Sequence, residues 1–248
     1  MTSPGPERDY RAVMRPEGLV AFQAAIETSD LWIAAESDLT AEALAEIARL
    51  RAELQDYLRR DPRFAEELKP WMPREDAPGL ARRMAKAARK CGVGPMAAVA
   101  GAFAEAVGRK LLASSREVRV ENGGDCFLAG ERPVTLGLFA GASPLTGNVG
   151  FRIRPDQLPC GVCTSSGTVG PSLSFGKADA AVIFSADTAL ADACATATAN
   201  LVKSSDDFGQ ALAFARRIEG VWGAALVARD EFAAWGDIEL VRLEQEQE

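Results

Sequence analysis

Apolar side chains recur at helical spacing over residues 44–58, and the opposite face of this segment is charged. Leucines and isoleucines three or four residues apart predict an amphipathic helix that starts with Thr40 as its N-cap, ends at Asp61-Pro62 and lies on a sheet. Gly101 stands among small residues where another backbone can approach closely. Four further helices are predicted over residues 79–91, 96–112, 187–202 and 205–218.

Short apolar runs bounded by Gly, Pro or Asn predict strands. A β-hairpin is predicted over residues 10–26, with its turn at Arg-Pro-Glu-Gly, and residues 31–34 continue in extended form. Further strands are predicted over 117–121, 125–129, 134–139, 149–153, 180–184, 221–227 and 238–243. Residues 163–176 are predicted as a loop, and the proline-rich residues 60–79 as a surface excursion that either covers a pocket or is a solvated linker. The order of strands, paired helices and strands occurs twice, which indicates an α+β architecture.

The length and charge of the chain limit the number of domains and the kinds of binding partner that we expect. The 248 residues are enough for one domain, predicted over 10–243 between a disordered start over 1–9 and a frayed acidic tail over 244–248. The net charge of −7 opposes binding to nucleic acid or to anionic lipid. The start lacks an apolar signal core, and no stretch approaches the ~20 apolar residues that span a bilayer. We expect a soluble, cytoplasmic protein whose anionic ligands are held by local donors, a metal or a few cations.

Histidine is missing from the sequence, whereas cysteine occurs five times. Acid–base chemistry near neutral pH must therefore come from a carboxylate, a lysine or a cysteine, and a His-dependent triad or metal centre is excluded. The odd number of cysteines favours reduced thiols. Cys160 and Cys163 form a single CxxC pair, which is either a redox or metal motif or a coincidence of two small buried residues.

Asp192 and Thr196 are four residues apart in an alanine-rich predicted helix, so their side chains share one face. A carboxylate and a hydroxyl there offer two hard oxygen ligands to Mg²⁺ and leave room for a phosphate. The alternative is a packing helix in which the threonine bonds back to a carbonyl and the aspartate meets a buried cation.

Two glycine-containing segments are candidates for ligand contact. The first segment is rich in hydroxyl groups and consists of Thr164, Ser165, Ser166, Gly167 and Thr168. It forms either a nest of N–H and hydroxyl donors for an anion or a structural turn. The second is predicted as a hairpin turn whose glycines also let a nucleotide approach the backbone, and it consists of Asn122, Gly123, Gly124 and Asp125. Lys177 follows as a cation that pairs with either a phosphate or Asp179.

These three motifs resemble, in order, the late signatures of the ApbE superfamily, the FAD:protein FMN transferases. The chain is more similar still to a UPF-type, ApbE-related family of short chains. It shares with them the runs ETSDLWIAA from Glu27, GVGPMAAVAGA from Gly92, VENGGD from Val120 and CTSSGTVG with SLSFGKADA from Cys163. The resemblance covers roughly Tyr10 to Val241.

The resemblance implies an ApbE-like, T-fold-like structure, in which an antiparallel sheet backed by helices is duplicated. It also implies Mg²⁺ at Asp192 and Thr196, with a third ligand from a main-chain carbonyl in 97–101, and FAD or FMN as a possible ligand. The chain departs from the flavin transferases at one point. They carry a His-His-Ile-x-Asp-Pro-x-x-Gly stretch after the Ser-Gly motif, which this chain lacks, and Pro171 stands where its nearer relatives have His.

We therefore expect a protein that binds a flavin, another nucleotide or a phosphorylated small molecule through Mg²⁺, and that is a possible phosphoryl or nucleotidyl transferase with Asp125 as the base. The resemblance also suggests an alternative role in sulfur assimilation, including homocysteine formation, in which Cys163 carries sulfur. A third hypothesis is a non-catalytic module whose glycines and alanines serve packing. A homo-oligomer is expected under all three hypotheses, because sheets leave edges to be covered.

Overall fold

The computed structural model describes residue 11 and residues 17–167 and 176–243. The predicted disordered start, most of the predicted first strand and turn over 10–18, and the predicted acidic tail lie outside these ranges.

The two halves of the chain follow the same order of elements. In the first half two strands precede the helices and two follow them: β1 (Val20–Ile26), β2 (Ser29–Ala35), β3 (Val118–Asn122) and β4 (Asp125–Ala129). The second half repeats this order with β7 (Cys160–Ser165), β8 (Ala180–Ser185), β9 (Val221–Ala228) and β10 (Glu231–Gly236). All eight strands form one antiparallel sheet in the order β1-β2-β3-β4-β7-β8-β9-β10. The predicted α+β class and the duplicated arrangement are confirmed.

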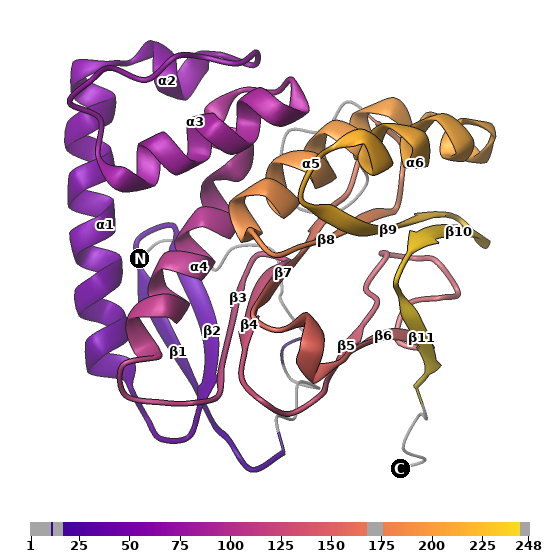
Figure 1. Cartoon of the computed structure of the whole chain (residues 1–248), viewed down its shortest axis with the longest axis horizontal. Coiled ribbons are helices and arrows are strands. Elements are labelled where there is room, and N and C mark those ends of the chain that lie inside the picture. The colour runs from indigo at the N-terminus through magenta and orange to yellow at the C-terminus, as the bar shows by residue number, and fades with distance from the viewer. Residues whose placement is uncertain (1–10, 12–16, 168–175, 244–248) are drawn as a thin grey trace.

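The helices cover one face of this sheet, as Figure 1 shows. The first half contributes α1 (Thr40–Arg60), α2 (Arg63–Glu66), α3 (Gly79–Cys91), a 3₁₀ turn (Pro95–Ala98) and α4 (Val99–Leu111). The second half contributes α5 (Thr188–Leu201), a 3₁₀ turn (Ser205–Asp207) and α6 (Phe208–Arg217). The apolar stripe of α1 packs on β1 and α4, because its leucines and isoleucines lie on one side of the helix. In the described ranges no single helix is long and apolar enough to cross a membrane, although Gly79–Cys91 and Pro95–Leu111, bent by 103°, meet the criteria of length and composition as a pair.

A second, smaller sheet packs on part of the other face. It has the order β11-β6-β5 and is formed by β5 (Val134–Gly137), β6 (Val149–Ile153) and β11 (Glu239–Arg242), and a 3₁₀ turn (Pro155–Gln157) leads from β6 to β7. The rings of Phe151 in β6 and Phe184 in β8 meet edge to face with centroids 5.1 Å apart. The part of the main sheet formed by β4 and β7 to β10 therefore lies between the helices on one side and the small sheet on the other.

Several sequence predictions need correction. The hairpin near the N-terminus joins β1 to β2, so residues 31–34 form its second strand. Strand β7 begins at Cys160 and extends three residues into the predicted loop 163–176, and β10 was not predicted. At the start of α1 the N-cap position is Leu39, and Asp38 Oδ1 accepts hydrogen bonds from the Thr40 N–H at 2.9 Å and hydroxyl at 2.6 Å.

The proline-rich excursion is not a solvated linker. Phe64 is fully buried, and the Asp61 carboxylate accepts hydrogen bonds from the Trp71 indole at 3.2 Å and from the Tyr57 hydroxyl at 3.0 Å. These contacts fasten the excursion to α1. A Cβ at Gly94 would meet the Glu67 carbonyl oxygen at 1.8 Å, so the excursion also packs tightly against the turn that precedes α4.

Helices α4 and α5 approach each other most closely at Gly101. A Cβ at this position would lie 2.5 Å from the Thr188 carbonyl oxygen and 2.8 Å from the Asp192 Cβ, so only a residue without a side chain fits. The predicted close approach of another backbone at Gly101 is confirmed.

We expect Gly101→Ala to lower the free energy of unfolding by about 1–3 kcal/mol, because rigid backbone and Cβ atoms must move apart to admit the methyl group. The matched control is Gly209→Ala in α6, where a Cβ meets nothing within 4 Å. This control should be neutral or stabilising by up to about 1 kcal/mol, because alanine favours helix. Urea denaturation measures both. Equal effects of the two substitutions would contradict the assigned contact.

Candidate functional site

Helices α4 and α5 cap each other. The first N–H groups of an α-helix have no partner inside the helix. At the start of α4, the Gly101 N–H donates to Asp192 Oδ2 at 2.8 Å. At the start of α5, the Thr188 N–H donates to Glu105 Oε2 at 3.0 Å. Each helix therefore supplies a carboxylate to the N-terminus of the other, where the helix dipole favours negative charge.

Asp192 is buried on α5 at the start of α4. Burial raises the pKa of its carboxyl group to about 7, and hydrogen bonds from the Gly101 and Ala100 N–H groups limit the rise. The side chain therefore changes charge near neutral pH. Thr196 lies one turn further along α5 and is half-buried, so the predicted shared face of the two side chains is present.

Asp125 lies close to Asp192 although the two residues come from different halves of the chain. Burial and then the negative charge of Asp192 raise the pKa of Asp125 well above its usual range, and hydrogen bonds from the Cys163 thiol and the Thr164 N–H oppose the rise. Its Oδ1 atom is buried and has no hydrogen-bond partner within the described part of the chain. A buried carboxyl oxygen without a partner is costly, so this atom is a candidate contact for a ligand.

The hairpin that carries Asp125 reaches the start of α4. Gly123 and Gly124 have φ angles of +67° and +100°, and Asn122 pairs with Asp125 across the turn, so the predicted hairpin turn is confirmed. The Asn122 side-chain amide donates to the Ala100 carbonyl oxygen at 3.0 Å. The hairpin and α4 are thus joined beside Asp192.

The hydroxyl-rich segment does not form the predicted nest of N–H donors in its described part. Thr164 and Ser165 continue strand β7, the Thr164 N–H donates to Asp125, and the Gly167 N–H donates to the Ala178 carbonyl at 2.9 Å. The hydroxyl groups remain as candidates, since the Ser165 Oγ is buried without a partner in the described ranges. Ser166 is half-buried, and Thr168 lies outside the described residues.

Lys177 is exposed, and its N–H donates to the Val202 carbonyl at 2.7 Å just beyond the C-terminus of α5. Asp179, its predicted alternative partner, accepts a hydrogen bond from the Arg229 N–H at 2.5 Å. Contact between Lys177 and a phosphate stays a prediction.

The CxxC pair is divided by the main sheet. Cys160 and Cys163 lie in β7 three residues apart, so their side chains point to opposite faces. Cys160 packs in the core under the small sheet, and Cys163 packs under the helices. The Cys163 thiol lies 3.4 Å from the Thr188 carbonyl oxygen, and burial raises its pKa well above the usual range. Two side chains that diverge in this way cannot form a disulfide or share a metal, so the interpretation as two small buried residues is the one that fits.

Two acidic residues at the site were missed in the sequence. Glu105 is almost fully buried. Burial alone would raise its pKa, but hydrogen bonds and ion pairs with Arg83 and Arg109, both at 2.7 Å, hold the pKa below its ordinary value. Glu121 is also buried and accepts the Gly124 N–H at 2.7 Å and the Arg11 guanidinium at 2.6 Å. A single glutamate among the apolar residues 99–108 was a detectable indication of Glu105.

Two surface hollows lie away from these carboxylates. One, of about 290 Å³, is lined by Ala142, Ser143, Pro144, Asp179, Arg229 and Asp230. The other, of about 120 Å³, lies between α3 and the start of α5 and includes Lys86, Lys90 and Asp187. Neither is lined by Asp125 or Asp192, so hollow size alone does not locate the candidate site.

The fold is that of the ApbE flavin transferases. The solved structure of flavinyl transferase ApbE from Pseudomonas stutzeri matches with a TM-score of 0.52 at 14% identity, over 88% of this chain and 94% of that chain. Flavin transferase ApbE from Vibrio cholerae matches with a TM-score of 0.55 at 11% identity, over 89% and 97%. The ApbE protein from Thermotoga maritima gives a TM-score of 0.55 at 12% identity, over 89% and 96%.

Sequence relatives then identify the family. Residues 11–231 match the family model described as AbpE bacteria. A UPF0280 protein from Methanocella arvoryzae is 44% identical over 191 residues, which cover 77% of this chain and 78% of the relative. A UPF0280 protein from Methanosarcina acetivorans is 43% identical over 209 residues, which cover 83% and 82%. The chain belongs to the ApbE-related family of UPF0280 proteins, as its motifs predicted.

The raised pKa of Asp192 predicts how stability depends on pH. An unfolded aspartate has a pKa of about 3.9, so the stability contributed by protonated Asp192 is complete below that pH and is lost as the pH rises to about 7. Asp192→Asn keeps a carbonyl oxygen for the Gly101 N–H but does not ionise. Relative to this variant, the wild type should lose up to ~1.4 kcal/mol of unfolding free energy per pH unit in this window. Chemical denaturation in metal-free buffer measures the difference, and a difference independent of pH would contradict the assignment.

Proposed function

We propose that this protein binds a flavin nucleotide or another phosphorylated small molecule together with Mg²⁺ at the contact between α4 and α5, and that it acts as a transferase of the ApbE type. The observation that carries the proposal is the position of Asp192. On a fold shared with flavin transferases, this carboxylate is buried at a helix N-terminus with a hydroxyl one turn away and a second carboxyl group beside it.

The residues present fit a magnesium ion. Asp192 and Thr196 offer hard oxygen atoms on one helix face, and the buried Asp125 Oδ1 has no other partner in the described part of the chain. Among the described residues, no group of three His, Cys, Asp or Glu side chains is arranged to hold a metal. The remaining ligands would therefore be hydroxyl, carbonyl, water or phosphate oxygens, as is usual for Mg²⁺. Such an ion would supply a positive charge that polarises a phosphoryl oxygen.

The chain's own groups then have separable tasks. The side chain of Asn122 and the N–H groups of Ala100 and Gly101 hold the start of α4 and orient Asp192. The proposed contacts for the phosphates are Lys177 and the hydroxyl groups of Thr164, Ser165 and Ser166. Burial and the charge of Asp192 raise the pKa of Asp125 well above its usual range, so a bound cation that offsets the charge would favour the ionised form that a base requires.

Two features separate this proposal from simple transfer of the ApbE activity. The sequence contains no histidine, so the histidine-containing stretch of the flavin transferases has no counterpart. The relation to the solved transferases is one of fold, at 11–14% identity. We therefore propose the binding of a nucleotide and a metal as the primary function, and group transfer as an activity that depends on this binding. Homo-oligomeric assembly, cytoplasmic location and the absence of nucleic-acid and membrane partners stay predictions from the sequence.

Calorimetric titration with FAD, with and without Mg²⁺, tests the proposal. We expect binding that requires Mg²⁺ and that weakens at least about tenfold, ~1.4 kcal/mol, in Asp192→Asn and Thr196→Val. ADP in place of FAD shows whether the phosphates or the flavin ring dominate recognition.

The matched control is Asp187→Asn, which removes one negative charge from the same helix at its N-cap, where Asp187 accepts the Leu190 N–H at 3.0 Å. This variant should keep wild-type affinity. If Asp187→Asn and Asp192→Asn weaken binding equally, the effect is one of net charge and the site assignment fails. The absence of binding to FAD and ADP under every condition would overturn the proposal itself.

The sulfur-carrying alternative makes a different prediction. The thiolate form of Cys163, which this alternative requires, is disfavoured. Cys163 is fully buried, and burial and the charge of Asp125 raise the pKa of its thiol. We expect Cys163 in the native protein to resist iodoacetamide at neutral pH and to react only after unfolding, as measured by peptide mass mapping. Rapid native alkylation of Cys163, faster than that of the half-buried Cys126, would favour the sulfur role over nucleotide binding.

A further inference from the structure

One end of the main sheet collects strand ends and turns from both halves of the chain. Strands β4 and β7 are antiparallel with Asp125 opposite Cys163, so the start of β4 and the end of β7 lie at this end. The start of β8 pairs with Ser165 at the end of β7. It also pairs with Val227 at the end of β9, which leads into the turn to β10. The candidate site and the turn between β9 and β10 therefore share one end of the sheet.

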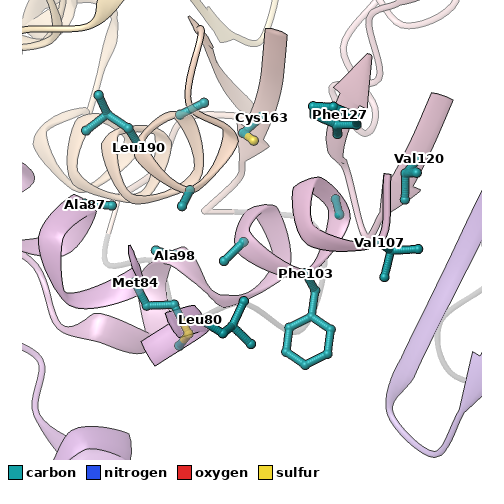
Figure 2. Packing of buried hydrophobic residues seen from close by; sticks show 14 of the residues in the cluster. Leu80, Met84, Ala87, Ala98, Phe103, Val107, Val120, Phe127, Cys163 and Leu190 are labelled. Atoms are coloured by element: carbon teal, nitrogen blue, oxygen red, sulfur yellow. The ribbon is translucent and has the colours of Figure 1, made fainter. Parts of the chain in front are cut away.

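The proposed phosphate contacts lie in the middle of this end, because the strand order is β4, β7, β8 and β9. Cys163 of β7 lies beside α5 in Figure 2, and Ser165, two residues further along the strand, points to the same face of the sheet. The Gly167 N–H donates to the Ala178 carbonyl oxygen at 2.9 Å. This bond brings the end of the hydroxyl-rich segment beside Asp179, so the segment leads from α5 toward β8 and β9.

The larger hollow described above lies where β8 and β9 reach this end. It has a volume of about 290 Å³ and lies between the turn from β9 to β10, the residue before β8 and the loop between β5 and β6. The Asp179 N–H donates to the Val227 carbonyl at 2.9 Å, and the Asp179 carboxylate accepts the Arg229 N–H at 2.5 Å. The Ser143 hydroxyl donates to the Arg229 carbonyl at 2.5 Å. The hollow is therefore held by hydrogen bonds, and it lies within two strand spacings, about 10 Å, of Gly167.

The groups that line the hollow suit a ribonucleoside. Ala142 and Pro144 give it apolar surface. The Asp230 carboxylate and the Arg229 guanidinium are exposed, and within the described residues neither group takes part in a hydrogen bond or an ion pair. A carboxylate accepts hydrogen bonds from ribose hydroxyl groups, and a guanidinium stacks on the face of an aromatic ring. The carboxylates of Asp179 and Asp230 outnumber the one guanidinium, so the hollow favours an uncharged group over a further phosphate.

We infer that this hollow is a subsite for the ribose and base of a ribonucleotide whose phosphates are held at the candidate site. The inference rests on the proposed function, and it narrows the ligand from phosphorylated small molecules in general to ribonucleotides such as ADP or the adenosine half of FAD. The order of phosphates, ribose and base in such a ligand follows the order of the strands from β7 to β9. The Asp230 carboxylate accepts the ribose hydroxyl groups, and the Arg229 guanidinium covers the base.

Calorimetric titration of the full chain with three ligands, each in the presence of Mg²⁺, tests the inference. Pyrophosphate reports on the phosphate and metal contacts alone, ADP adds the nucleoside, and 2′-deoxy-ADP lacks one ribose hydroxyl group. We expect Asp230→Asn to weaken the binding of ADP at least about fivefold, because hydrogen bonds to a charged group are lost, and to leave the binding of pyrophosphate unchanged. Loss of the 2′-hydroxyl group should weaken binding to the wild type but not to Asp230→Asn.

Two further variants separate the contribution of each side chain from that of net charge. Arg229→Asn removes the guanidinium but keeps a residue type that tolerates the φ angle of +58° at this position, so it should weaken the binding of ADP and not that of pyrophosphate. Glu231→Gln is the matched control, because it removes one negative charge beside Asp230 from a residue that does not line the hollow. This control should leave all three affinities unchanged.

The outcomes distinguish failure of the subsite from failure of the proposed function. If pyrophosphate binds with Mg²⁺ but the affinity for ADP does not respond to Asp230→Asn, the subsite is overturned and the metal site stays in place. The subsite is also overturned if Asp230→Asn weakens pyrophosphate and ADP equally, or if Glu231→Gln weakens ADP as much as Asp230→Asn does. If neither pyrophosphate nor ADP binds, the proposed function fails and the subsite fails with it.

Discussion

The close contact between α4 and α5 at Gly101 is the constraint on which the candidate site depends. With any side chain at this position the helices would stand further apart, and Asp192 would not reach the free N–H groups at the start of α4. The same contact brings Glu105 to the start of α5. Two helices from different halves of a duplicated fold thus each accept hydrogen bonds from the N-terminal N–H groups of the other. The Asp192 carboxylate is buried because the two helices pack together, and no binding loop is needed to hold it.

Electrostatics make this junction a suitable place for a cation. Asp125 and Asp192 are both buried and close enough for the charge of one to oppose ionisation of the other, so without a ligand they hold protons at pH values where exposed aspartates have none. Three arginines near this junction form ion pairs with other carboxylates. Arg83 and Arg109 pair with Glu105, and Arg11 pairs with Glu121. A bound metal ion would favour the ionised form of both aspartates, so that their protons are released. Its positive charge would also offset the repulsion between the two buried carboxylates.

The sequence predicted the helices more completely than the strands and the site. The helix from Thr40 was evident because its leucines repeat with the period of a helix. Strand β7 was not predicted, because Cys-Gly-Val-Cys-Thr-Ser has small and polar residues on a strand buried on both faces. Motif resemblance made Asp192, Thr196 and Asp125 candidates, and the structure places Asp125 close to Asp192. Local patterns carry no information about which helices meet, so the capping role of Glu105 at the start of α5 required the tertiary structure.

The most direct measurement of the central claim is an anomalous difference map from crystals grown with Mn²⁺ in place of Mg²⁺ and with ADP. Mn²⁺ accepts the same hard oxygen ligands and is visible by its anomalous scattering. The account predicts a single strong peak within bonding distance of the Asp192 carboxylate and the Thr196 hydroxyl, with the α4–α5 contact unchanged. A peak elsewhere, or none beside Asp192 while ADP is bound at another place, would contradict it.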